Sequence, residues 1–359
     1  MIDPVPMARS LPFPTRAAGR AVVRLVVLAA AVGAWLAAAV PAFAHGDVTP
    51  PEPSAWSFLV DWSFEPLLQV PLLLSAALYL QGVRRVAERH PASPVPRRRA
   101  VAFIAGLVAI EIALQSGIEA YDTTLFSVHM VQHVLLTLVA APLLVLGAPV
   151  TLLLRVASHE QRRRYVLPVL HGRIVRLLTH PVMAWLVFSA VMWGTHFSPL
   201  FNHSLEDPLV HDLEHLLYLS SALLFWWPGI GSDPAPWRMA HPARILYLFL
   251  QMPQNTFLAL AIFSAGAPLY PHYATVARSW GPSVLADQQG AGAIMWVAGD
   301  LVFLAAMLGV VLAWMHDEER RESRRAAQVA AARAAIRARE LELAERLARE
   351  GQAGSGAER

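Results

Sequence analysis

Long apolar stretches recur along the chain at the length that a membrane-spanning helix needs. Such a helix requires about 20 mostly apolar residues to cross ~30 Å of hydrocarbon. The stretches that meet or approach this requirement are 21–43, 66–82, 100–118, 127–153, 181–197, 209–228, 244–266 and 291–315. Pro142, Gly147 and Pro149 interrupt one of them, but neighbouring helices of a bundle can satisfy the backbone groups that such residues free.

The charged residues between these stretches test the number of spans independently. The chain contains no lysine, so its 29 basic residues are all arginine. All of them except Arg278 fall on the N-terminal segment, on every second loop or on the tail that begins at His316. The positive-inside rule requires such a distribution, which predicts that both ends of the full chain are cytoplasmic.

Together these patterns predict an all-α, polytopic membrane protein, a bundle of seven transmembrane helices that follows an N-terminal hydrophobic leader. Ala42-Phe43-Ala44 fits an A-x-A cleavage site, so the leader is either a removed signal peptide or a retained signal-anchor. The parts that we expect are the leader at 1–44, an extracytoplasmic segment at 45–65, the seven-helix membrane domain at 66–315 and a cytoplasmic, charged helical tail at 316–359.

Composition supports the membrane class and limits the chemistry. Hydrophobic residues make up 56% of the chain and charged residues 15%, whereas soluble proteins average about 25% charged. The absence of cysteine excludes a disulfide framework, a thiolate metal site and a cysteine nucleophile. Because topology explains the arginines, we expect contacts with anionic lipids of the bilayer and no nucleic-acid partner.

Two pairs of histidines lie at the outer ends of two predicted spans. His129 and His133 form one pair, and His211 and His215 form the other. The i, i+4 spacing puts both imidazoles of a pair on one helix face, where they can reach a single ion at about 2.0–2.1 Å. At ~1.5 Å per residue, His133 and His215 lie at matched depth, on the order of 9 Å below the outer boundary. With His196 at a similar end, the pattern predicts one metal site that opens outward.

Other polar and sulfur-containing residues are candidates to support this site, because charged groups inside a bilayer are costly. The acidic candidates are Glu111, Glu214, Asp300 and Asp212. Each could act as a ligand, an orienting group or a proton carrier. For Glu111 and Asp300, structural hydrogen bonding is an equal interpretation. Met130 lies between the first pair and Met192 one turn before His196, while His203 is expected in the short loop that follows. Thioethers together with imidazoles favour copper, especially Cu(I). The plain alternative is that these methionines fill gaps in the core.

Short motifs around the histidines match a known pattern. They are His129-Met130-Val131-Gln132-His133, Ala141-Pro142-Leu143-Leu144, Gly147-Ala148-Pro149, then Trp193 and His196, His211-Asp212-Leu213-Glu214-His215 and Trp226-Trp227-Pro228. Over roughly residues 55–315 the chain resembles the CtaG family of cytochrome c oxidase assembly factors, the type that serves caa-type oxidases. The resemblance implies a seven-helix membrane protein that acts in the maturation of a haem–copper oxidase and delivers copper to it. Lack of cysteine argues against a thiol-based transfer of copper.

The leading hypothesis is therefore a non-enzymatic assembly factor in a bacterial cell membrane, with cytochrome c oxidase subunits as partners. It would bind copper at the extracytoplasmic face through the paired histidines. Three alternatives stay open: a scaffold that holds no metal, a haem-binding electron carrier, and an intramembrane metalloprotease. The last reading rests on His211, Glu214 and His215, which match the zinc motif H-x-x-E-H.

Overall fold

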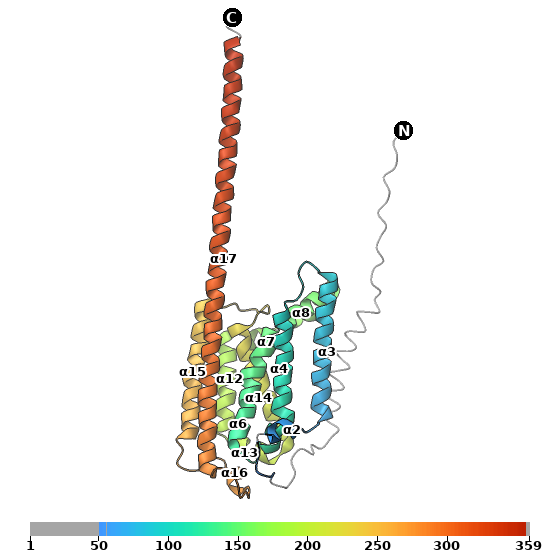
Figure 1. The fold of residues 1–359 in the computed structure, drawn as a ribbon, viewed down its shortest axis with the longest axis vertical. Coiled ribbons are helices and arrows are strands. Elements are labelled where there is room, and N and C mark those ends of the chain that lie inside the picture. Colours follow the sequence, from blue (N-terminus) through green and yellow to red (C-terminus); the bar gives the residue numbers. More distant parts are fainter. Residues whose placement is uncertain (1–49, 55, 357–359) are drawn as a thin grey trace, which may run out of the picture. The chain divides into compact units, whose positions relative to one another are not determined.

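The structure is a computed structural model that describes residues 50–54 and 56–356. The expected leader at 1–44, including the Ala42-Phe43-Ala44 site, lies outside the described residues. Every regular element in the described part is a helix (Figure 1), and the elements are, in chain order, α2 (Ser57–Val60), α3 (Pro66–Arg89), α4 (Arg97–Gln115), α5 (Gly117–Tyr121), α6 (Phe126–Val134), η1 (Leu135–Ala140), α7 (Ala141–Leu146), α8 (Pro149–Val156), α9 (His159–Gln161), η2 (Arg162–Val166), α10 (Leu167–Leu170), α11 (Arg173–Leu178), α12 (Pro181–His196), α13 (Pro199–Glu206), α14 (Pro208–Ile230), α15 (His241–Phe263), α16 (Pro271–Thr275) and α17 (Val284–Gly356).

Helical segments in the described part include five that are long and apolar enough to cross a membrane. These are Pro66–Arg89, Arg97–Tyr121, Phe126–Val156, His241–Phe263 and Val284–Leu343. The prediction of a helical membrane protein is thereby confirmed. The other two expected spans correspond to α12, which has only 16 residues, and α14, whose first turns carry acidic and histidine side chains. These two helices pack along each other.

Several helices continue beyond the apolar stretches that predicted them. The stretch expected to end at Gly82 continues in α3 to Arg89, so arginines that we assigned to a loop are helical. Arginine permits this extension because its aliphatic stem can cover apolar surface while its charged end reaches a polar layer. Arg89 additionally donates a hydrogen bond of 3.0 Å from Nη1 to the carbonyl of Val156.

The helical run from α6 to α8 changes its winding twice. Two residues after His133 the chain enters the π-helix η1, in which Thr137 donates from Oγ1 to the carbonyl of His133 at 2.6 Å. Trp226 of α14 in turn donates from Nε1 to the carbonyl of Thr137 at 2.8 Å. A π-helical turn is frequent at functional sites, and here it follows the first histidine pair in the same helical run. Ala148, with φ of 51°, then begins α8 at the predicted Gly-Ala-Pro interruption.

Close backbone approach holds α4 against α7. A Cβ on Gly106 would lie 2.8 Å from Cγ of Leu144, so a larger residue there would push the helices apart. Around this contact an apolar cluster joins α4, η1 and α7; its buried members are Leu107, Ala109, Ile110, Ala113, Leu136, Ala140 and Leu144. This cluster continues the helical run that begins with α6, and Figure 1 shows α4, α7 and α14 running side by side.

The start of α6 is held by an acid from a distant part of the chain. Asp287 on α17 accepts hydrogen bonds from the backbone N–H groups of Phe126 at 2.7 Å and Ser127 at 3.3 Å. The first N–H groups of a helix have no partner within the helix, so this carboxylate caps α6. The depth of His129 is consequently set by contact with α17 as well as by the hydrophobic pattern.

The chain divides into two units, Met1–Ala306 and Met307–Arg359. In the second unit α17 continues as a helix to Gly356. Val329, Ile336 and Leu343, which recur every seven residues, are 51%, 56% and 57% exposed in it.

Candidate metal centre

Helices α6 and α14 bring the two histidine pairs together. The rings of His129 and His211 lie 5.3 Å apart, and those of His133 and His215 lie 5.7 Å apart, centroid to centroid. All four side chains are 5% exposed or less. The two pairs therefore meet in one buried cluster, which we call the histidine cluster and which consists of His129, His133, His211 and His215.

The first pair presents two nitrogens to each other. Nε2 of His129 and Nε2 of His133 are 2.9 Å apart. Two ligands at about 2.05 Å from one ion and 2.9 Å from each other subtend about 90° at the ion, which is an ordinary ligand angle. The same spacing permits a hydrogen bond when one ring carries its proton on Nε2. The pair is thus arranged either to share a proton or to chelate a metal.

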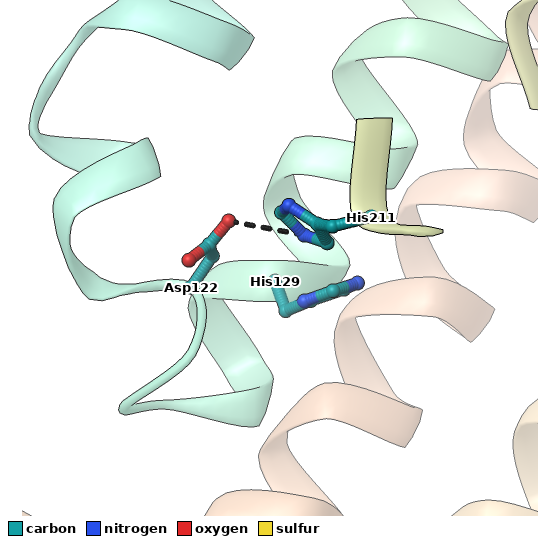
Figure 2. Close-up of side chains that lie close together, drawn as sticks. All are labelled: Asp122, His129 and His211. Carbon is teal, nitrogen blue, oxygen red and sulfur yellow. Dashed lines mark ion pairs between the residues drawn. The ribbon is translucent and has the colours of Figure 1, made fainter. Parts of the chain in front are cut away.

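Asp122 approaches the cluster from the turn between α5 and α6 (Figure 2). Its Oδ2 lies 3.4 Å from Nε2 of His211, and its side chain is fully buried. A 3.4 Å separation corresponds to about 110° at an ion bound at about 2.05 Å, close to the tetrahedral angle. Burial raises the pKa of the Asp122 carboxyl to about 8, because the charged form loses its water. Such a carboxylate gains most from a nearby cation.

Two sets of donor atoms come close enough to hold an ion. Asp122, His129 and His211 form the first set, and His129, His133 and Glu214 form the second; within each set the ligand atoms lie within 4.8 Å of one another. All members of both sets are buried. His129 belongs to both, so it is the central residue of the arrangement. Imidazole nitrogens with carboxylate oxygens form a donor set that fits a transition-metal ion.

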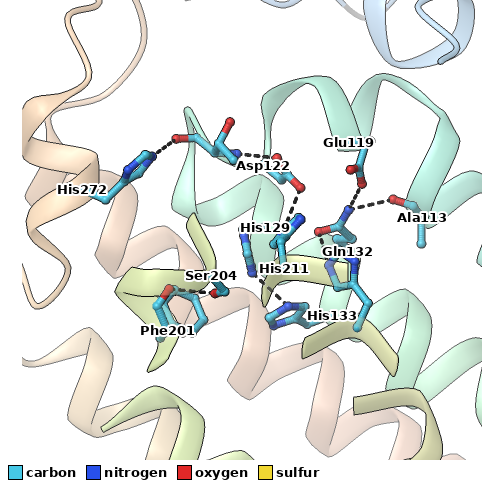
Figure 3. Close-up of polar contacts among 12 residues, drawn as sticks. Ala113, Glu119, Asp122, His129, Gln132, His133, Phe201, Ser204, His211 and His272 are labelled. Carbon is cyan, nitrogen blue, oxygen red and sulfur yellow. Dashed lines mark hydrogen bonds and ion pairs between the residues drawn. The ribbon is translucent and has the colours of Figure 1, made fainter. Parts of the chain in front are cut away.

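Gln132 organises the side of the cluster that faces α4 (Figure 3). Its Nε2 donates to the carbonyl of Ala113 at 3.0 Å and to the carboxylate of Glu119. These bonds orient the amide, so its Oε1 accepts from Nε2 of His215 at 3.0 Å. His215 therefore carries its proton on Nε2, which leaves only Nδ1 for a metal. Such hydrogen bonds to the second nitrogen of a ring orient histidines around metal ions.

His196 lies beside the cluster at the end of α12. Its ring is 6.4 Å from that of His133, and its Nδ1 lies 2.8 Å from the carbonyl oxygen of Met192. A backbone carbonyl only accepts, so Nδ1 carries the proton and Nε2 holds a lone pair. That Nε2 is buried without a hydrogen-bond partner. His196 is close to the two metal-capable sets but does not belong to either.

Aromatic rings close the cluster on the side of α13 and α16. The ring of Phe201, which is fully buried, lies 5.0 Å from His129 and 5.3 Å from His196. Tyr273 donates to the carbonyl of Asp122 at 2.9 Å. His203, expected in a loop, instead lies on α13, because Ser198 and Pro199 start a short helix there. These elements keep the cluster out of contact with water.

Comparison with known proteins identifies the family. The family model for the cytochrome c oxidase caa3 assembly factor (Caa3_CtaG) matches residues 77–317. The chain belongs to the CtaG family. The matched region contains α4 to α16 and every residue of the cluster, so the resemblance seen in the sequence is confirmed.

Curated relatives of this CtaG chain come from mycobacteria. An uncharacterized protein of Mycobacterium bovis is 32% identical over 282 residues, and one of Mycobacterium leprae is 31% identical over 287 residues. Each alignment covers 77% of this chain but only 42% and 43% of the relative. The chain thus spans about two fifths of the length of the curated relatives that it matches. No solved structure matches it.

Of the residues expected to support the site in this CtaG chain, some lie at the histidine cluster and others lie elsewhere. Glu214 reaches the cluster as a donor. Asp300 instead accepts hydrogen bonds from Thr256 at 3.1 Å and from Trp296 at 3.0 Å, a structural contact between α15 and α17. Glu111 is partly exposed on α4, and Asp212 is exposed on α14. Met130 and Met192 are buried beside the cluster.

Sequence reasoning missed Asp122, Glu119 and Gln132. The first two lie just past the predicted span at 100–118, at an edge where acids are common, and no spacing pattern marks them. The sequence does contain a usable signal for Asp122 and Glu119. The connection between the predicted spans at 100–118 and 127–153 is short, so these acids must lie near the level of His129. Gln132 was read only as part of a motif, although it stands one residue before His133 and faces α4.

Proposed function

We propose that this CtaG-family chain is a non-enzymatic membrane factor that binds copper in the histidine cluster and delivers it to a haem–copper cytochrome c oxidase during assembly. In this proposal the membrane domain at 66–315 is a bundle of seven transmembrane helices, with α12 and α14 as the two spans that miss the length or hydropathy expected of a single helix. The positive-inside pattern puts the cluster on the extracytoplasmic side and the tail in the cytoplasm.

The observation that carries the proposal is the sharing of His129 between two buried sets of ligand atoms. Burying imidazoles and carboxylates is costly unless each is paired or bound to a cation. Here several of them are brought together where the bilayer begins, so the arrangement makes physical sense if a cation resides among them. Copper is the ion that fits imidazole donors with thioethers nearby.

Some of these residues would bind the ion, and others would orient its ligands or exclude water. His129, His133 and His211 would supply nitrogens, and Asp122 with Glu214 would neutralise the charge. Gln132 would orient His215, and the rings over the cluster would exclude water. An ion bound by these groups would be cargo, held until an oxidase subunit offers stronger ligands.

Geometry argues against one of the alternative functions. An H-x-x-E-H protease needs His211 and His215 on one zinc ion with Glu214 aimed at its water. Instead Glu214 groups with the histidines of α6.

Metal analysis of the purified full-length protein, paired with cell measurements, tests the proposal. We expect copper bound to the wild type and lost from the variant with His129, His133, His211 and His215 all changed to Ala. Membranes of a deletion strain should contain oxidase that is deficient in copper, and the wild-type gene should restore it where the variant does not.

The two readouts separate the proposal from the scaffold alternative. Restoration of the oxidase by the four-alanine variant would favour a scaffold that holds no metal. Equal copper content in the wild type and the variant would remove the histidine cluster as the binding site. His203→Ala is the matched control, because His203 is an exposed histidine on the neighbouring α13.

A further inference from the structure

A small cavity lies next to the histidine cluster, between the helices α6, η1, α12, α14, α15 and α17. Its volume of about 30 Å³ has room for an ion or a water molecule. Among the residues that line it are three methionines from three different helices, Met130, Met192 and Met295. Each of the three is less than 9% exposed.

Two histidines line the same cavity with nitrogens that have no hydrogen-bond partner. These atoms are Nδ1 of His133 and Nε2 of His196, whose side chains are 5% and 4% exposed. The opposite nitrogen of each ring is already engaged, by His129 for His133 and by the Met192 carbonyl for His196. Buried polar atoms are almost always paired, so two unpartnered nitrogens at one cavity point to a ligand.

We propose that this cavity is a second copper site, distinct from the histidine cluster and selective for Cu(I). Its donors would be thioether sulfurs from Met130, Met192 and Met295 with an imidazole nitrogen from His196. Soft sulfur ligands select Cu(I), and the lining contains no carboxylate to favour a harder ion. The proposal rests on the proposed function, since it assumes that copper is the cargo.

His133 belongs both to the histidine cluster and to the lining of the second site. One of its nitrogens faces His129 in the histidine cluster, and the residue also lines the cavity. An ion bound in the cluster would thus be separated from the cavity by a single imidazole. The cavity extends farther along the helical run than the cluster does, because it is lined by Met130 and His133 of α6 and by Thr137 of η1. Copper could pass between the sites by exchanging ligands at His133, without a change of oxidation state when it enters as Cu(I).

Titration of the full-length protein in detergent with Cu(I), under reducing conditions and without oxygen, tests this site. We expect two equivalents of Cu(I) per wild-type chain and one in the triple variant Met130→Leu, Met192→Leu, Met295→Leu. Leucine approximates methionine in volume, so the core should stay packed. The matched control changes Met183, Met252 and Met315 to Leu, methionines that do not line the cavity, and it should keep both equivalents.

X-ray absorption at the copper edge of the wild type needs no variant and keeps the proposal testable if the triple variant fails to fold. Sulfur scatterers around copper are expected in the wild type and the control, and their absence would overturn the proposal. An equal number of Cu(I) equivalents in the wild type and the triple variant would also overturn the proposal. The cavity would then be a site for a water molecule.

The outcome is separable from that of the proposed function. The variant His129→Ala, Asp122→Asn removes donors of the histidine cluster only and should retain the sulfur-bound equivalent. If sulfur-bound copper persists while the deletion strain makes a copper-replete oxidase, the second site stands as a binding site and delivery to the oxidase fails. If delivery holds but no sulfur is bound, only the second site fails.

Discussion

Two neighbouring regions of the α6–α7 run have opposite chemistry although one continuous helical segment supplies both. Around His129 and His133 the segment contributes to a buried polar cluster, whereas Leu136 and Ala140, one and two turns later, belong to the apolar cluster with α4. Leu136 and Ala140 lie within the π-helix η1, which begins at Leu135, directly after the last residue of α6. One end of the segment collects groups that are costly to bury, and the other end collects groups that pack at no such cost.

The comparison indicates that different residues provide stability and function in this chain. Inside a bilayer, packing between helices holds the fold, because lipid is as apolar as leucine and provides little hydrophobic driving force. The apolar cluster and the Gly106 contact supply that packing. The histidine cluster adds desolvated polar groups instead, so a variant that empties it should not weaken the fold as a core variant does.

The largest effect on metal binding is expected from His129→Ala. This residue belongs to both sets of ligand atoms, so its loss removes a donor from each. We expect the affinity for copper to fall by more than about 100-fold, beyond the range typical of outer-shell partners. Competition titration with a chelator of known affinity measures this. Thermal stability without metal should change little, and a large loss would mean that the cluster is a structural element.

Leu136→Ala should have the opposite effect, since it should lower the stability of the fold and leave copper binding unchanged. Leu136 is fully buried in the apolar cluster, so its truncation leaves a cavity that costs about 2–5 kcal/mol in comparable cores. Reversible unfolding in mixed detergent micelles reports this change. Copper stoichiometry per folded chain should equal that of the wild type. Loss of copper from the folded variant would show that the two regions are coupled more tightly than we expect.

Gln132→Leu sharpens the comparison, because it removes hydrogen bonds and keeps approximate volume. Without the amide, His215 and Glu119 lose their shared partner, so the orientation of His215 is no longer fixed. We expect affinity to fall by about 10–100-fold with unchanged stoichiometry. Isothermal titration of the variant beside His203→Ala gives both quantities. An unchanged affinity would remove His215 from the metal centre.

Asp300→Asn should have the smallest effect. Asparagine can still accept from Thr256 and Trp296, the partners of the carboxylate. We expect stability within about 1 kcal/mol of the wild type and the same copper affinity. A clear loss of oxidase assembly in cells that express this variant at normal levels would reveal a role that its contacts do not suggest.

Much of the site could be read from local patterns, and the rest depended on contacts between distant segments. Spacing of four residues was enough to pair His129 with His133 and His211 with His215, because a helix repeats its faces at that interval. Asp122 and Glu119 gave no comparable pattern, since Glu119 lies on the five-residue helix α5 and Asp122 in the turn after it, and the path of both depends on the helices around them. Asp300 is an acid inside a predicted span, yet its partners Thr256 and Trp296 lie on α15 and α17 and not at the cluster.

Local patterns in the sequence establish that this is a helical membrane protein, which residues pair on one helix face and which family the chain belongs to. These features follow from hydrophobic length, helical periodicity and motif spacing, which are local properties of the chain. Tertiary structure alone decided that α6 and α14 face each other, that Asp122 and Glu214 join the histidines, and that three methionines surround one cavity. Those facts depend on how helices far apart in the sequence pack and cap one another, as Asp287 does for α6, and no local pattern encodes that packing.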